Sequence, residues 1–151
     1  MKKGLLAFFI LAISAFSIPL SGVDSDDVHE FRGKHFIASY SECDKDAINN
    51  EDILMQVMIA AVEKCGAQIL NYSSHVFPGH GVTMVILLSE SHASIHTYPE
   101  YGACFVDLFT CGNRCSNVPF DEALQAYLKP KTMNQKVLVR HEGIEENESG
   151  L

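Results

Sequence analysis

The sequence predicts an α+β fold in which a mainly antiparallel sheet carries two helices packed on one face. Two patterns support this prediction. Short apolar runs typical of strands recur along the chain, and two stretches between them repeat apolar residues with helical spacing. The composition agrees, because 47% hydrophobic and 20% charged residues among 151 are typical of one folded domain.

Each element can be placed from its own pattern and from the glycine, proline and polar residues that separate it from the next. In chain order we expect a strand at 33–40, a turn at 41–44, a helix from about 46 or 50 to 64, a strand at 67–73, a loop at 74–81, strands at 82–89, 91–97 and 103–110, a loop at 112–118, a helix at 119–128 and a closing strand at 136–139. No internal repeat interrupts this order.

The first helix has identifiable ends and an apolar stripe. Asn50 is a suitable N-terminal cap, and Gly66 is placed to end the helix. The expected stripe consists of Ile53, Val57, Ala60 and Ala61, with Leu54, Met58 and Cys65 beside it. In the second helix, Pro119 is expected at the first turn, where its missing N–H costs nothing.

The two ends of the chain differ from the middle in composition. Residues 1–22 begin with Met1, Lys2 and Lys3 and continue as an apolar run, which is the pattern of a secretory signal peptide or an anchor. A start codon assigned too early is the alternative. Residues 23–32 are expected to be a polar linker, residues 33–142 the folded domain, and residues 143–151 a disordered acidic tail.

Charge and cysteine content restrict the function. A formal net charge of −8 argues against nucleic acid as a partner, because phosphate binding requires a basic face. The five cysteines are odd in number and include no C-x-x-C pair, so no metal site is expected. This pattern suits mostly reduced, buried thiols in a reducing compartment, which disagrees with the signal-like N-terminus.

A polar cluster follows the apolar run at 82–88. Residues 89–100 contain three serines, two histidines and two glutamates. A solvated hairpin turn would explain them, but so would a site, since clustered polar groups require partners. The next apolar run ends in Cys111, so the strands could bring Ser91, His96 and Cys111 to neighbouring edges of one sheet.

Two motifs, S-E-S-H-A-S-I-H-T-Y-P-E-Y-G and D-L-F-T-C-G, closely resemble those of the prokaryotic S-adenosylmethionine decarboxylases. The resemblance covers residues 33–142. It implies a two-layer α/β sandwich, a pyruvoyl cofactor made from the chain itself, a homo-oligomer of processed heterodimers with sites near the shared interface, and a cytoplasmic location. The N-terminal 22 residues depart from the family pattern.

The resemblance also implies roles in self-processing. Ser91 would attack the carbonyl of Glu90, cleave the chain between residues 90 and 91, and become the pyruvoyl group that forms a Schiff base with the substrate amine. His96 would assist the elimination. Thr83 stands where the family has a serine, so the hydroxyl is kept on a stiffer side chain. Cys111 would return a proton to the product.

Substrate binding is implied for Phe77, by stacking on adenine, and for Glu100, by binding ribose hydroxyls or a cation. The implied activity is decarboxylation of S-adenosylmethionine for spermidine and other polyamine synthesis. The loop F-P-G-H-G-V-T departs from the family order, which leaves open an ornithine or arginine decarboxylase whose distal cation binds Glu100 and Asp107. An unprocessed, non-catalytic homologue with a regulatory or binding role is a third hypothesis.

Overall fold

The computed structural model describes residues 32–141, so the expectations for residues 1–22, for the linker before Arg32 and for the tail at 143–151 lie outside the described residues. The elements are β1 (Arg32–Ser41), α1 (Lys45–Ile48), α2 (Glu51–Cys65), β2 (Ile69–Val76), β3 (Val82–Leu88), β4 (Ser91–Tyr98), the 3-10 turn η2 (Pro99–Tyr101), β5 (Ala103–Cys111), α3 (Asn117–Leu128) and β6 (Thr132–His141).

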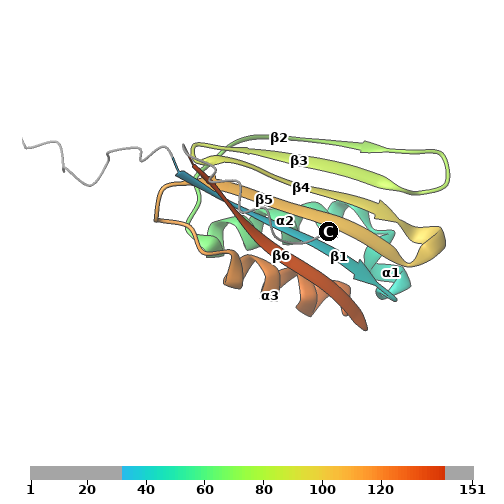
Figure 1. Cartoon of the computed structure of the whole chain (residues 1–151). Helices are drawn as coiled ribbons and strands as arrows, with labels where there is room; N and C mark the ends of the chain where they lie inside the picture. The colour runs from blue at the N-terminus through green and yellow to red at the C-terminus, as the bar shows by residue number, and fades with distance from the viewer. Residues whose placement is uncertain (1–31, 142–151) are drawn as a thin grey trace, which may run out of the picture.

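The six strands form one antiparallel sheet in the order β2-β3-β4-β5-β1-β6, and the helices lie together on one side of it (Figure 1). The predicted fold class, an α+β two-layer sandwich, is therefore confirmed. Among the described residues, no helix is long and apolar enough to cross a membrane.

The core lies between the sheet and the helices, and strand alternation decides which residues enter it. Along β3 and β4, every second residue is buried, as with Met84, Ile86 and Ile95. These side chains pack against the buried stripe of α2 and the buried face of α3. The intervening residues point away from the helices.

The buried stripe of α2 differs from the expected one. The residues that enter the core are Leu54, Met58, Ala61, Val62 and Cys65, whereas Ile53 keeps 43% of its surface exposed. Ile53 lies one position from Leu54, about 100° around the helix. Packing against the sheet buries the residues that were expected beside the main stripe, together with Ala61 of that stripe and Val62.

The helix boundaries follow from capping. The side chain of Asp44 accepts hydrogen bonds at the start of α1, and that of Asn50 accepts one from the Ile53 N–H at the start of α2. The two suggested starts thus belong to two helices. Gly66 ends α2 with φ of +92°, a conformation that favours glycine. Helix α3 begins two residues before Pro119, because Ser116 caps it.

The bounds of two strands differ most from those expected. Strand β2 extends into the expected loop as far as Val76, and β6 covers residues 132–141 rather than 136–139. Strand β6 pairs with β1 over ten residues. Its polar first half carries no apolar alternation, so backbone pairing with a distant strand defines it.

Candidate active site

The sheet face opposite the helices carries the polar residues singled out from the sequence. Strands β3, β4 and β5 present alternate side chains on this open face, while their other residues are buried under the helices. Residues of the open face include Thr83, His96 and Cys111. The candidate site is therefore built on rigid strands.

Ser91 and Cys111 meet at one end of this face. Ser91 is the first residue of β4 and pairs with Thr110 on β5. Its hydroxyl Oγ lies 3.7 Å from the Cys111 thiol Sγ, and both residues are partly buried. The nucleophile and the thiol expected from the sequence are thus in contact.

The peptide group before Ser91 is held at both its carbonyl and its side chain. The backbone N–H of Cys111 donates a 3.0 Å hydrogen bond to the Glu90 carbonyl oxygen. The Gln68 N–H donates to the Glu90 carboxylate at 3.0 Å. Partial burial opposes ionisation of Glu90, but hydrogen bonds from Gln68 and from the Ser89 side chain outweigh it and lower the pKa of this carboxyl.

Ser91 has an unusual backbone. Its φ of +153° is one that residues with a side chain rarely adopt, and Ser91 is one of four described non-glycine residues with positive φ. In a regular strand its side chain would follow Ala93 toward the helices. The distorted backbone instead directs the hydroxyl to Cys111.

Thr83 and His96 meet at the other end of β4. They are cross-strand partners on β3 and β4, and the Thr83 Oγ1 lies 2.8 Å from His96 Nδ1. Threonine in place of serine therefore retains the hydrogen bond to the imidazole.

The two residues expected to bind substrate lie toward this same end. Phe77 precedes β3, and its N–H donates to the Gly81 carbonyl at 2.7 Å to close the loop. Immediately after this loop, at the start of β3, the Val82 N–H donates to Thr97 Oγ1 on β4 at 2.8 Å. Glu100 follows β4 in η2, exposed to solvent.

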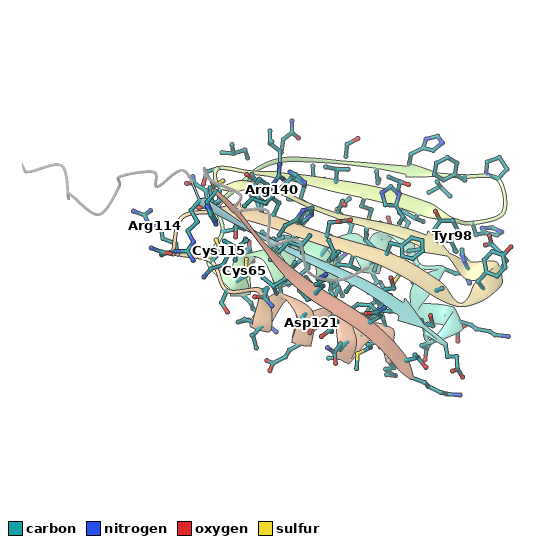
Figure 2. The ribbon with its side chains drawn as sticks, viewed as in Figure 1. Cys65, Tyr98, Arg114, Cys115, Asp121 and Arg140 are labelled. Carbon is teal, nitrogen blue, oxygen red and sulfur yellow. The ribbon has the colours of Figure 1, made fainter. Side chains whose placement is uncertain are left out.

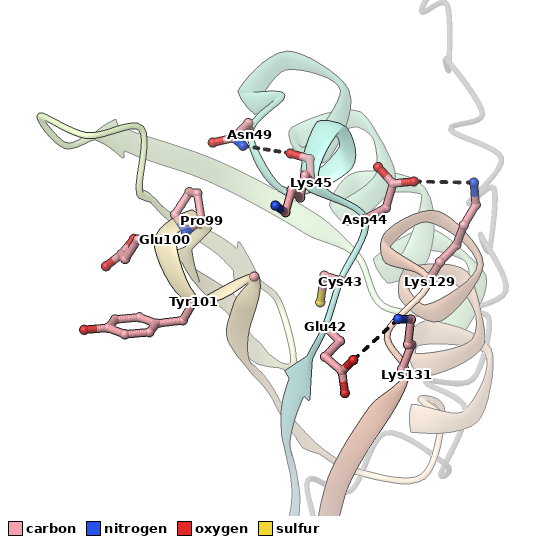
Figure 3. A pocket seen from close by; sticks show the side chains of 11 residues that line it. Glu42, Cys43, Asp44, Lys45, Asn49, Pro99, Glu100, Tyr101, Lys129 and Lys131 are labelled. Carbon is pink, nitrogen blue, oxygen red and sulfur yellow. Dashed lines mark hydrogen bonds and ion pairs between the residues drawn. The ribbon is translucent and has the colours of Figure 1, made fainter.

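Glu100 also lines a pocket of about 730 Å³ at this end, between the β1–α1 turn and η2 (Figure 3). Its charged residues largely pair with each other, Lys131 with Glu42 at 3.5 Å and Lys129 with Asp44 at 3.9 Å. These exposed ion pairs contribute little to stability.

The site residues therefore form two separate clusters. The Ser91 cluster contains Glu90, Ser91 and Cys111, and the His96 cluster contains Thr83 and His96. Phe77 and Glu100 lie in the connections next to β3 and β4. Ser91 and His96 are five residues apart on one strand, about 16 Å at 3.3 Å per residue. Ser91 and Cys111 lie together on neighbouring strands of one sheet, whereas His96 lies farther along β4, because an extended strand separates residues that are near in sequence.

A further polar network lies between the clusters. His35 Nε2 is 3.2 Å from one oxygen of Asp107, and the Ser94 hydroxyl donates to the other at 3.3 Å. Next to it, Phe109 packs against the rings of His35 and His92, and the Arg140 guanidinium lies 4.5 Å above the Phe109 ring. His35 and Arg140 were not singled out from the sequence. Strand alternation would place His35 on this face, whereas Arg140 lies beyond the expected end of the closing strand at residue 139.

No group of three or more histidine, cysteine, aspartate or glutamate side chains within residues 32–141 could hold a metal ion. The family model for S-adenosylmethionine decarboxylase matches residues 34–141, which is most of the chain. The chain belongs to the S-adenosylmethionine decarboxylase family.

Relatives in this family cover the same region. The S-adenosylmethionine decarboxylase proenzymes of Thermotoga petrophila and Thermotoga maritima are 39% and 38% identical to the chain over 119 residues, which is 79% of this chain and 89% of each relative. The crystal structure of the adenosylmethionine decarboxylase of Aquifex aeolicus is 31% identical, has a TM-score of 0.67, and matches over 81% of this chain and 99% of its own. The suspected family is thus confirmed.

Proposed function

We propose that the chain is a proenzyme that cleaves itself between Glu90 and Ser91 and then decarboxylates S-adenosylmethionine with a pyruvoyl group. One observation carries this proposal: the Ser91 hydroxyl contacts the Cys111 thiol, while the Cys111 N–H donates to the Glu90 carbonyl. The nucleophile, the carbonyl that it would attack and a hydrogen-bond donor to that carbonyl thus converge at one peptide bond. The relatives named as proenzymes are consistent with such a step.

The cleavage begins with attack of the Ser91 Oγ on the Glu90 carbonyl carbon. The Cys111 N–H is already aimed at the oxygen on which negative charge would develop, so it serves as an oxyanion donor. Collapse transfers the Glu90 acyl group from nitrogen to oxygen and gives an ester. The positive φ of Ser91 stores strain in the reactant.

Completion of the cleavage requires a base. Removal of the Ser91 Cα proton expels the Glu90 carboxylate and leaves a dehydroalanine, whose hydrolysis releases ammonia and leaves a pyruvoyl group at residue 91. A histidine is suited to this proton transfer. His96 has a hydroxyl partner in Thr83 that fixes the orientation of its ring.

His96 cannot serve as that base within one copy of the chain, because it lies about 16 Å along the strand from Ser91. Consider two copies that pack with their open faces together and are related by a twofold axis. Their β4 strands then run in opposite directions, so the His96 cluster of one copy lies against the Ser91 cluster of the other. A twofold axis makes both composite sites at once. We therefore propose a homo-oligomer with shared sites.

The open face has the apolar surface that such packing requires. Val85, Leu87 and Phe105 keep 43%, 50% and 49% of their surfaces exposed, although all three lie in central strands of the sheet. Exposed apolar residues that group on one face indicate an interaction surface.

The Ser91 cluster also fits the pyruvoyl group. When formed, its carbonyl supplies the electron sink for the carbanion that loss of carbon dioxide leaves on an amino acid. The Cys111 Sγ lies 3.7 Å from the Ser91 Oγ, so the thiol is placed to deliver a proton next to residue 91.

Phe77 and Glu100, in the connections next to β3 and β4, support S-adenosylmethionine as the substrate. Phe77 has 48% of its surface exposed and so offers a ring for adenine, and Glu100 offers a carboxylate for ribose hydroxyls. The ornithine or arginine hypothesis required Asp107 as a second free carboxylate, but His35 and Ser94 occupy both of its oxygens. The structure therefore favours the larger substrate.

The test combines cleavage and turnover. The Ser91→Ala variant should stay whole and inactive, whereas Ser94→Ala, a matched change on the same strand, should be cleaved. Carbon dioxide release should be measured from carboxyl-labelled S-adenosylmethionine, ornithine and arginine. Normal cleavage of Ser91→Ala would overturn the mechanism, and release from ornithine or arginine alone would overturn the substrate. An uncleaved natural chain would favour the non-catalytic hypothesis.

A further inference from the structure

Four of the five cysteines are arranged as two neighbouring pairs, a feature that the proposed activity does not use. Cys43 follows β1 and lies near Cys104 at the start of β5, and the Cys104 thiol lowers the pKa of the Cys43 thiol. Cys65, the last residue of α2, lies near Cys115, just before α3, at one end of the molecule (Figure 2). All four residues are buried.

Backbone contacts bring the segments that carry each pair close together. The Cys43 N–H donates to the Gly102 carbonyl at 2.9 Å, two residues before Cys104. The Ser116 N–H, next to Cys115, donates to the Cys65 carbonyl at 3.1 Å. A disulfide needs α carbons roughly 4.4–6.8 Å apart, so the close approach of these segments is the first requirement for a cross-link.

Cys111 is the cysteine left over. It contacts the Ser91 hydroxyl rather than another thiol. The five cysteines are therefore two pairs that could be cross-linked and one cysteine, Cys111, whose thiol must stay free for the proposed reaction. The pairs carry no local sequence signal, because their members are about fifty or sixty residues apart.

We propose that Cys43 with Cys104, and Cys65 with Cys115, form disulfides that covalently join the two chains produced by self-cleavage. Cys43 and Cys65 precede the bond between residues 90 and 91, and Cys104 and Cys115 follow it. Both disulfides would therefore cross the cleavage point. The joining of two chains rests on the proposed function, whereas the pairing of the cysteines does not.

The oxidation is a thiol–disulfide exchange with an external disulfide such as oxidised glutathione. One cysteine thiolate attacks that disulfide and releases one thiol, and its partner then attacks the mixed disulfide and releases a second. The two cysteines lose two electrons and two protons, and the external disulfide is reduced. The N-terminal segment, if it is the export signal that its sequence suggests, would deliver the chain to a compartment that supplies such an oxidant.

The two pairs differ in reactivity. The hydrogen bond from Cys104 lowers the pKa of the Cys43 thiol, which makes Cys43 the attacking group of its pair. Burial raises the pKa of Cys65, and it raises that of Cys115 to about 12. The second pair is therefore expected to be oxidised during folding, before these thiols are buried.

The consequence is a processed enzyme whose two chains cannot separate. After cleavage, residues up to 90 contribute β1, α2, β2 and β3, while β4, β5, α3 and β6 belong to the second chain. Only packing and strand pairing would hold these pieces together in the reduced protein. Two cross-links would keep them joined through dilution or local unfolding.

The test is an intact-mass measurement on the full chain, produced in a host that forms disulfides and lysed in N-ethylmaleimide to block free thiols. When it is denatured without reductant, the protein should be one species that contains both chains and one maleimide, on Cys111. Its mass without the maleimide should be four hydrogens below the summed masses of the two reduced chains. Reductant should release two chains split after residue 90. In the Cys65→Ala/Cys104→Ala double variant the chains should separate without reductant, while Cys111→Ala should stay joined and carry no maleimide.

Failure of this proposal and failure of the proposed function give different spectra. Two chains that separate without reductant and carry five maleimides would overturn the cross-links and leave self-cleavage intact. One uncleaved chain, even after reduction, would overturn self-cleavage. The number of maleimides on it, one or five, would then decide the pairing by itself.

Discussion

The separation of the two clusters predicts that inactive variants rescue one another. Ser91→Ala removes the nucleophile but keeps the His96 cluster, and His96→Ala does the reverse. Each variant alone should remain uncleaved. When the two are produced together, a mixed dimer contains one composite site with both Ser91 and His96, so the His96→Ala chain should be cleaved.

The size of the rescue follows from the geometry. About 16 Å between Ser91 and His96 within one chain excludes direct proton transfer, since a base must be within about 3 Å of the proton or act through one water. With equal amounts and random pairing, about half of the His96→Ala chains would be in mixed dimers, each with one complete site. Every His96→Ala chain in a mixed dimer should be cut, which is about half of all His96→Ala chains. Intact mass measures this fraction when the two variants carry different isotopes.

A matched pair provides the control. Thr83→Ala and His96→Ala both damage the His96 cluster, so no mixed dimer of these two variants contains a complete site. This combination should give no rescue. Two results would contradict the shared site. One is no cleavage of His96→Ala chains in mixed dimers with Ser91→Ala. The other is cleavage of His96→Ala at the natural rate when it is produced by itself.

Three further predictions concern single changes. Cys111→Ala should still be cleaved, but its turnover should fall by roughly 10²–10⁴-fold, the usual contribution of a positioned proton donor; unchanged carbon dioxide release would remove the thiol from the reaction. Tyr40→Phe removes the hydrogen bond to Asp121 and should cost about 2 kcal/mol in urea unfolding. Burial and then the hydrogen bond to Asp121 raise the pKa of Tyr40. The neutral phenol therefore stabilises the fold fully below the unfolded pKa of about 10, and this stabilisation is lost as pH rises through the folded pKa. The Tyr40→Phe variant should lack this loss of stability at alkaline pH. Asn50→Ala removes the N-terminal cap of α2 and should cost about 1 kcal/mol, with no change in cleavage.

The fold could be predicted because most elements carry local signals. Alternation in β3 and β5 and the caps Asn50 and Gly66 are properties of neighbouring residues. The full length of β6 could not be predicted, since its first half is polar and is fixed by pairing with β1. The stripe of α2 was ambiguous for a similar reason: only the sheet decides between Ile53 and Leu54.

The sequence motifs indicated candidate site residues but not their arrangement. The motifs supplied Ser91, His96 and Cys111, but their density in the sequence suggested one cluster. Strand geometry alone indicates that residues 91 and 96 lie far apart. By contrast, the hydrogen bond from Cys111 to the Glu90 carbonyl depends on the register of β4 against β5, which a sequence does not specify.

The most direct test of the central claim is the mass of the purified, reduced protein with and without a carbonyl-trapping amine. The proposed chemistry predicts two chains, split between Glu90 and Ser91, and the trapping amine should add only to the chain that begins at residue 91. A single chain with the full mass and no trapped carbonyl would contradict self-processing, and with it the pyruvoyl reaction proposed for this protein.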